Sequence, residues 1–108
     1  MADERFWLLR GSGMPRFEGN RLYLDGVVDI QTVAALLPEG AAHVRAGAEV
    51  IDFGAVTEVD SSAVALALAW LREARAAGRT IAFANLPPAM ANLARLYAVS
   101  DLIPVAER

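Results

Sequence analysis

The spacing of apolar residues along the chain predicts short strands that alternate with helices. Four runs have the length and composition of strands, and one of them alternates between polar and apolar positions. The four runs are Phe6 to Arg10, Arg21 to Asp25 (the alternating one), Glu49 to Phe53 and Thr80 to Ala84. Between the first two, Gly11 to Gly19 holds three glycines and a proline and predicts a loop, so these strands are expected to form an antiparallel hairpin.

Three further segments show the three- to four-residue apolar spacing of helices that pack on a sheet. The first helix should be capped by Asp29, is disturbed at Pro38 and Gly40, and gains another turn over residues 41–46. Four aliphatic side chains form its predicted apolar face: Ile30, Val33, Leu36 and Leu37.

The second helix is predicted from Ala63 to Ala77 and ends at Gly78. Its core stripe consists of Val64, Ala67, Leu68, Leu71 and Ala74. The third helix opens at Pro88, a favoured first position for proline, and its apolar face consists of Met90, Leu93, Leu96 and Tyr97. Leu102-Ile103 is expected to form a last short strand. The predicted order is ββαβαβα, which is typical of an α/β protein.

Composition narrows the class of protein. A chain of 108 residues is long enough for one core, and 56% of its residues are hydrophobic. The net charge of −3 and the scattered basic residues give no footprint for nucleic acid or anionic lipid. There is no cysteine, no signal-peptide pattern and no apolar stretch near the ~20 residues of a membrane span. We therefore expect a soluble cytoplasmic domain.

The stretch from Val50 to Ser62 carries the most functional information. An apolar run ends at a Gly-containing loop, and Asp60-Ser61-Ser62 then stands where a helix begins. A helix start offers unpaired backbone N–H groups and the positive end of the helix dipole, which suit an anion, a helix cap or a modified hydroxyl. Asp and Ser are preferred caps and stabilise by about 1 kcal/mol. Capping needs one such residue, so three in succession point beyond capping.

Other side chains give little support for catalysis. The single histidine, His43, lies in a predicted surface segment where no partner positions it as a base. Ser61, His43 and Asp52 could be written as a triad, but no G-x-S-x-G pattern supports it. Asp52, Glu58 and Asp60 lack the spacing of an EF-hand, and no glycine-rich nucleotide motif is present. We expect no enzyme activity, no metal and no cofactor.

Leu66 and Trp70 lie four residues apart on the second helix, off its core stripe. They are expected to face outward or sideways, and two interpretations stay open. Either a neighbouring helix covers them, or they form a docking patch for a protein partner beside Ser61, because tryptophan is enriched at interface hot spots. An exposed Trp70 could also serve a homodimer.

These features together resemble a known family. Val50-Ile-Asp-Phe53 and Val59-Asp-Ser-Ser62, followed by an aliphatic helix, are similar to the signature of STAS domains, the anti-sigma-factor antagonists and their relatives. Leu22-Tyr-Leu-Asp-Gly26 and Asp29 resemble the early strand and turn of that family. The resemblance spans about residues 20 to 104 of a single domain. It implies a mixed sheet of four to five strands flanked by helices, and a function through binding a protein partner.

The resemblance implies two kinds of partner. In the antagonists a kinase phosphorylates the first hydroxyl residue after the Asp, a role that corresponds to Ser61, although those proteins have Gly-Leu where this chain has Ala63-Val64. Ala91 to Tyr97, with Asp101 to Pro104, is instead similar to the C-terminal end of the MlaB-like STAS subunit of bacterial phospholipid-trafficking ABC transporters.

In the MlaB-like branch the STAS subunit binds the cytoplasmic ATPase subunit and supports its assembly and activity. The expected partner is therefore an ABC ATPase subunit, and an anti-sigma-factor kinase is the alternative. The predicted contact residues are Asp60, Ser61, Ser62, Ala63, Leu66 and Trp70.

Overall fold

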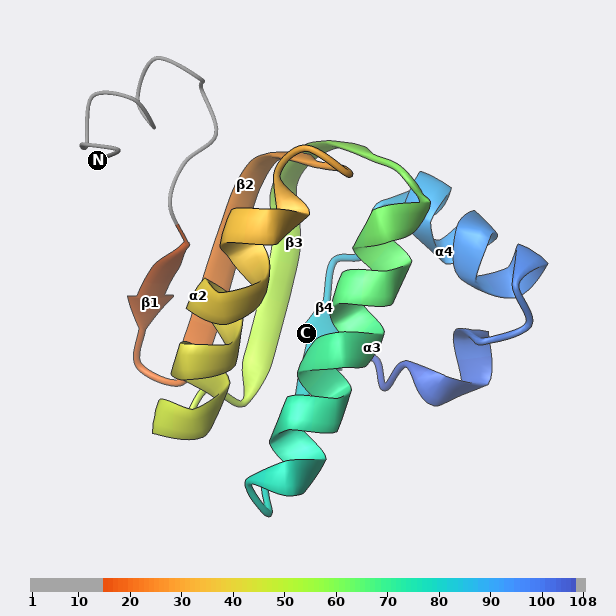
Figure 1. Ribbon diagram of the computed structural model, residues 1–108. Helices are drawn as coiled ribbons and strands as arrows, with labels where there is room; N and C mark the ends of the chain where they lie inside the picture. Colours follow the sequence, from red (N-terminus) through yellow and green to blue (C-terminus); the bar gives the residue numbers. More distant parts are fainter. Residues whose placement is uncertain (1–14, 107–108) are drawn as a thin grey trace.

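A computed structural model describes residues 15–106, in which strands and helices alternate in the predicted order (Figure 1). The elements are β1 (Arg16–Glu18), β2 (Arg21–Val28), α2 (Val33–Ala46), β3 (Val50–Val59), α3 (Ser61–Ala76), β4 (Ala82–Ala84), α4 (Pro88–Leu96) and the 3-10 helix η1 (Ser100–Leu102). From β2 onward, the predicted order βαβαβα is confirmed. The strand predicted at Phe6 to Arg10 lies outside the described residues.

The strands form one mixed sheet in the order β1-β2-β3-β4. β1 is antiparallel to β2, and the other two pairs are parallel. The first strand of the hairpin differs from the prediction, because β1 lies inside the stretch expected to be a loop. Phe17 gives β1 an apolar side chain to pack, and its ring lies 4.8 Å from that of His43 on α2. Gly19, with a φ of 64°, makes the turn back to β2.

β3 is longer than predicted and runs through Gly54, where a loop was expected. Tyr23 of β2 pairs with Asp52, but Asp25 pairs with Ala55, so β3 holds one extra residue between these pairs. A second register shift follows between Gly26 and Val27. Such bulges disturb the period-2 pattern by which a strand is recognised, which explains why the second half of β3 was missed.

Helix α2 runs without a break through Pro38 and Gly40. Proline removes one backbone hydrogen bond, and glycine weakens a helix by about 1 kcal/mol relative to alanine. Tertiary packing offsets both effects, since Gly40, Ala41 and Val44 are buried. The predicted turn over residues 41–46 is therefore part of one continuous helix.

The start of α2 differs from the prediction. Asp29 lies ahead of the helix, and its Oδ1 accepts hydrogen bonds from the backbone N–H groups of Gln31 and Thr32 at 2.9 and 3.2 Å. This side-chain turn places Thr32 at the N-cap position. Ile30 consequently lies outside the helix, and it is 70% exposed rather than part of the apolar face.

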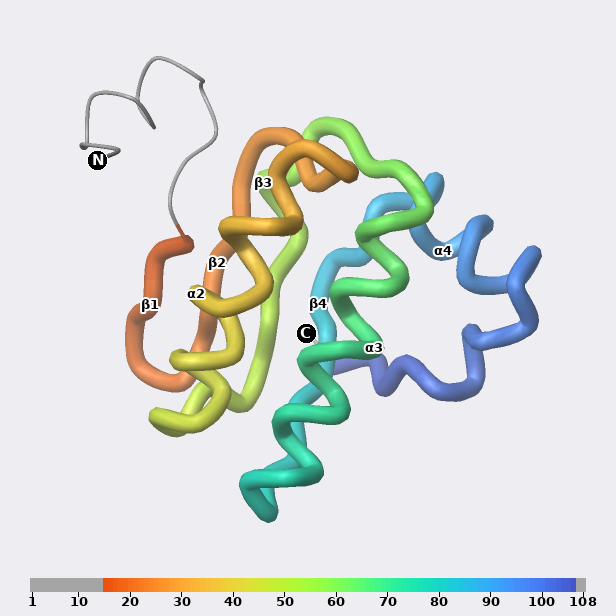
Figure 2. The backbone as a smooth tube through the Cα atoms, viewed as in Figure 1, coloured from red at the N-terminus to blue at the C-terminus, as the bar shows by residue number. Residues whose placement is uncertain are grey.

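Helices α2 and α3 lie side by side over one face of the sheet, and α4 packs beside α3 (Figures 1 and 2). The core lies between this helical layer and the sheet. Its largest buried side chains are Trp70, Phe53, Phe83, Leu22, Leu24, Ile51, Met90, Val28 and Val44. The predicted stripe on α3 is confirmed, because Val64, Ala67 and Ala74 are buried and the two leucines pack against the core.

The C-terminal region departs from the prediction in two respects. On α4, Met90 is buried, but Leu96 and Tyr97 are 74% and 51% exposed. Leu102 ends the 3-10 helix instead of starting a strand, and Val105 forms an isolated bridge to Phe83. Within residues 15–106, no helix is both long and apolar enough to cross a membrane.

Candidate functional site

The Asp60 side chain accepts hydrogen bonds from two loops, which lie at the carboxyl ends of β2 and β3. It is the N-cap of α3, and its Oδ1 accepts a hydrogen bond from the backbone N–H of Ser62 at 2.8 Å. The Ser62 hydroxyl donates to the same oxygen. The other oxygen, Oδ2, accepts from the backbone N–H of Ile30 at 3.1 Å. The predicted cap is confirmed, and the same carboxylate also holds the turn that precedes α2.

These hydrogen bonds stabilise the charged form of the Asp60 carboxyl. The Ser62 hydroxyl lowers its pKa most, and the backbone N–H groups of Ser62 and Ile30 lower it further. Partial burial acts in the opposite direction but is outweighed, so the pKa of Asp60 lies below its ordinary value. Asp60 therefore holds both loops as a carboxylate at neutral pH.

The two serines of the triplet have different environments. Ser62 is half-buried, and its hydroxyl is engaged by Asp60. Ser61 is exposed and is the first residue of α3, where backbone N–H groups lack helical partners and the helix dipole is positive. Of the six predicted contact residues, Ser61 is the only exposed one. Its hydroxyl is the accessible chemical group at this junction.

Of the two interpretations of Leu66 and Trp70, coverage by a neighbouring helix is confirmed, and the outward docking patch is wrong. Leu66 is 3% exposed and Trp70 is 0% exposed, because helix α2 covers this side of α3. The Trp70 Nε1–H donates to the backbone carbonyl of Leu37 at 3.0 Å. Ala63 is fully buried as well. Leu66, Trp70 and Ala63 therefore belong to the core and do not form part of the exposed surface around Ser61.

Asp52 belongs to a structural network and not to a catalytic triad. Burial raises the pKa of Asp52. Hydrogen bonds from Asn85, the Gly54 N–H and Arg21, together with the charge of Arg21, outweigh this effect, so the pKa lies below its ordinary value. The Arg21 Nε lies 2.9 Å from Asp52 Oδ2. His43 instead packs against the ring of Phe17. The contacts that a triad needs are thus taken up by other groups.

Comparison with known proteins identifies the family. The family described as "Mlab, STAS domain" matches residues 15–104. The chain belongs to the STAS domain family. STAS domains are generally non-catalytic regulatory proteins that act through protein–protein interaction. No curated protein matches this chain.

Solved structures share the fold of this STAS domain. The anti-sigma factor antagonist SpoIIAA in its unphosphorylated form is 20% identical, with a TM-score of 0.66 over 88% of each chain. The phosphorylated form of SpoIIAA, the Bacillus cell fate determinant, is 21% identical, with a TM-score of 0.62 over 88% of this chain and 91% of that one. The likeness confirms the expected mixed sheet flanked by helices.

Ile30 is a surface residue of this STAS domain that sequence reasoning placed in the core. Asp60 holds its backbone beside the start of α3. Ala34 and Ala65, four residues after Ile30 and Ser61, are exposed as well, and these four residues are called the strip. Further along the same two helices lies a groove of about 380 Å³ between α2 and α3. The residues that line this groove are Leu37, Pro38, Ala41, Arg45, Ala69, Arg72 and Glu73.

We call this strip and groove, with Ile30 and Ser61, the α2–α3 surface. Its near end is apolar apart from Ser61, and Leu37 is 40% exposed. At its far end Arg45 and Glu73 form an ion pair at 3.0 Å. The turn formed by Asp29 ahead of Thr32 is the sequence signal that could have placed Ile30 outside the helix.

Proposed function

We propose that this STAS domain binds the ATPase subunit of a bacterial phospholipid-trafficking ABC transporter and regulates its activity. The observation that carries the proposal is the match to the family described as "Mlab, STAS domain" over residues 15–104. The similarity of Ala91 to Tyr97, and of the residues up to Pro104, to the MlaB-like C-terminal end supports the same branch.

The α2–α3 surface is the proposed contact for this partner. Ile30 is an exposed aliphatic side chain beside the start of α3, where Ser61 is accessible, and Leu37 is exposed further along α2. Full burial of such a side chain stabilises by about 1.5–3 kcal/mol. The surface is preformed, because Asp60 fixes Ile30 beside α3 and Trp70 fixes α2 against α3. A preformed surface loses little conformational entropy on binding.

Binding of the purified domain to the ATPase subunit from the same organism, measured by calorimetry, tests the proposal. Ile30→Asp is expected to weaken binding by about tenfold or more, which corresponds to about 1.4 kcal/mol. Leu96→Asp is the matched control, because Leu96 is as exposed as Ile30 but lies on α4. Its affinity should stay close to that of the wild type. The steady-state ATP hydrolysis rate of the subunit should change on adding wild-type protein and not on adding the Ile30 variant.

Ser61→Glu probes the same contact at the start of α3. An acidic residue at a helix N-terminus stabilises by about 0.3–1 kcal/mol, so a loss of binding would not reflect unfolding. Equal affinities for wild type, Ile30→Asp and Ser61→Glu would rule out the α2–α3 surface as the contact. A wild-type protein that does not bind the ATPase at all would contradict the proposed function itself.

The second candidate function is that of an anti-sigma-factor antagonist switched by phosphorylation of Ser61. The exposure of Ser61 at the N-terminus of α3, and the fold shared with SpoIIAA in its unphosphorylated and phosphorylated forms, favour it. A phosphate adds about −1.5 to −2 charges at a helix end that favours anions. Incubation with a switch kinase and ATP should then add one phosphate to wild type and to Ser62→Ala, but none to Ser61→Ala, by intact mass. An unmodified wild-type protein would exclude this function.

A further inference from the structure

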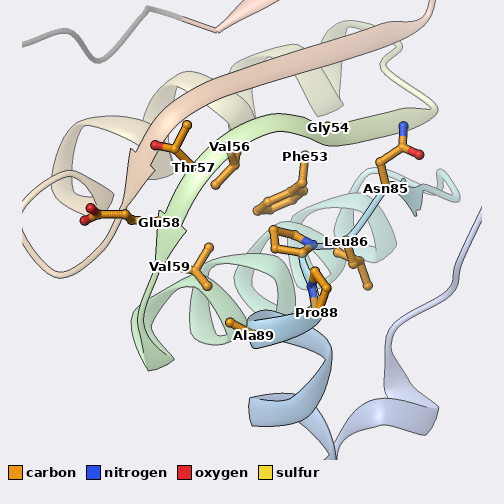
Figure 3. A pocket seen from close by; sticks show the side chains of 11 residues that line it. Phe53, Gly54, Val56, Thr57, Glu58, Val59, Asn85, Leu86, Pro88 and Ala89 are labelled. Carbon is orange, nitrogen blue, oxygen red and sulfur yellow. The ribbon is translucent and has the colours of Figure 1, made fainter.

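A second groove lies between the latter half of β3 and the turn that joins β4 to α4 (Figure 3). Its volume is about 870 Å³. The apolar residues that line it are Val56, Val59, Leu86, Pro87, Pro88 and Ala89, with the buried core residue Phe53 beneath them. Figure 3 shows Phe53 and Leu86 facing the space between the two walls, whereas the carboxylate of Glu58 points away from it. The side chains that face the groove are thus uncharged.

One wall of this groove is an open strand edge. β4 pairs with β3 only as far as Asp52 and Ala84, yet β3 continues to Val59. Within residues 15–106, no strand pairs with β3 on that side beyond Asp52. The backbone N–H and C=O groups of an unpaired edge can accept an added strand.

The opposite wall cannot close this edge. Asn85, with a φ of 57°, turns the chain away from β3 at the end of β4. Its Nδ2 donates to Asp52 Oδ1 at 3.0 Å and holds the turn in that position. Pro87 and Pro88 then follow, and neither carries the N–H that pairing would need. Asn85, Pro87 and Pro88 therefore prevent the chain after β4 from pairing with this edge of β3.

We propose that an extended apolar segment of a partner protein adds to β3 at this edge as a further strand. The residues from Gly54 to Val59 span about 20 Å at ~3.3 Å per residue, which matches a short strand. Backbone pairing would supply affinity, and the apolar walls would select apolar side chains at alternate positions.

The segment belongs to the protein that contacts Ser61, and in this respect the inference rests on the proposed function. The groove is continuous with that contact, because Val59 lines it and directly precedes Asp60 and Ser61. Ala89, near the start of α4, lines the same groove as Val59 (Figure 3). A single partner can therefore cover Ser61 and extend a segment along β3.

The variant Ala89→Arg tests this inference, because Ala89 is exposed and a long side chain there would fill the groove. The matched control is Ala76→Arg, an equal change at an exposed position at the end of α3. With the ATPase subunit as the probe, Ala89→Arg should weaken binding by about tenfold, and Ala76→Arg should not. Hydrogen exchange should slow in the wild-type complex at the β3 amides after Gly54 that face the groove, since the Gly54 N–H already donates to Asp52. Wild-type affinity of Ala89→Arg, or unchanged exchange of these amides, would overturn the inference.

Cross-linking locates the segment directly. The chain has no cysteine, so Ala89→Cys and Ala76→Cys each accept a single benzophenone maleimide. The probe at position 89 should cross-link one continuous apolar segment of the ATPase, and the probe at position 76 should not. Cross-linking to no segment, or equally from both positions, would overturn the inference while leaving the proposed function intact if the ATPase still binds.

If the ATPase does not bind, the proposed function fails and the groove is tested with a displayed library of random octapeptides. Enrichment of alternating apolar peptides that Ala89→Arg abolishes would support strand addition by another partner protein. No enrichment would overturn it. Self-association of the wild-type chain that Ala89→Arg abolishes would assign the groove to a second copy and would also overturn it.

Discussion

Replacing Gly40 with alanine is expected to destabilise this protein, although alanine is the better helix former. A Cβ atom at Gly40 would lie 2.2, 2.3 and 2.6 Å from Cζ2, Cε2 and Nε1 of Trp70. The indole cannot move freely, because it is fully buried and its N–H is bonded to the carbonyl of Leu37. Helices α2 and α3 would therefore have to separate.

The magnitude follows from opposing contributions. Glycine to alanine in a helix interior gains about 1 kcal/mol of propensity. Overpacking a buried contact costs about 1–3 kcal/mol, and weakening the Trp70–Leu37 hydrogen bond costs about 1 kcal/mol more. The net expectation is a loss of about 1–3 kcal/mol. With a urea m-value of about 1–3 kcal/mol/M, the unfolding midpoint should fall by roughly 1 M.

Urea unfolding followed by far-UV circular dichroism measures this change. The control is Ala42→Gly, which removes a methyl group from an exposed position of the same helix and reports propensity alone. It should lower the free energy of unfolding by about 1 kcal/mol. If Gly40→Ala has a midpoint equal to or above that of the wild type, the close packing of Gly40 on Trp70 is refuted.

Three further predictions concern the polar networks. The pKa of Asp60 is lowered in the folded state, so its contribution to stability is present above its ordinary pKa and is lost as the pH falls through the folded value. In urea titrations, the difference in unfolding free energy between wild type and Asp60→Asn should therefore shrink below about pH 4. A difference that stays constant with pH would contradict the lowered pKa. Ser62→Ala should lower the free energy of unfolding by about 1 kcal/mol through the weakened cap, whereas Ser61→Ala should change it by less than about 0.5 kcal/mol in the same assay. Arg21→Met should lower the free energy of unfolding by about 1–3 kcal/mol at pH 7, because the buried Asp52 carboxylate loses a partner. The loss should be smaller at a pH low enough to protonate Asp52, and an equal loss at pH 7 and at that lower pH would argue against the ion pair.

Periodicity was sufficient for the helix face that packs on the sheet. The stripe on α3 and the start of α4 at Pro88 were predicted correctly, because each is governed by local spacing or by the fixed geometry of proline. Trp70 was misplaced because α3 has two buried sides, one against the sheet and one against α2. A hydrophobic pattern that is compared only with the face toward the sheet cannot show that a second face of the helix is buried against another helix. The signal that could have done so is Gly40, a glycine inside a helix that leaves room for a large side chain.

The candidate site was predictable in part for a similar reason. Asp60 and Ser61 follow from the composition of a helix start, which depends on a few consecutive residues. The turn at Asp29 is a local signal that Ile30 lies outside α2, but its position beside α3 depends on a hydrogen bond to Asp60, thirty residues later in the chain. The open edge of β3 was also out of reach, since it requires β3 to continue past two bulges and the chain to turn away at Asn85.

The carboxylate of Asp60 connects these local and distant features. Oδ1 accepts from both donors of Ser62, and Oδ2 accepts from Ile30, so one side chain sets the position of the exposed aliphatic residue relative to the start of α3. A structural cap and a surface for a partner are therefore not competing interpretations of Asp60-Ser61-Ser62. Because Asp60 and Ser62 satisfy each other, the hydroxyl of Ser61 is not needed for capping, and the position between them is available for contact or modification.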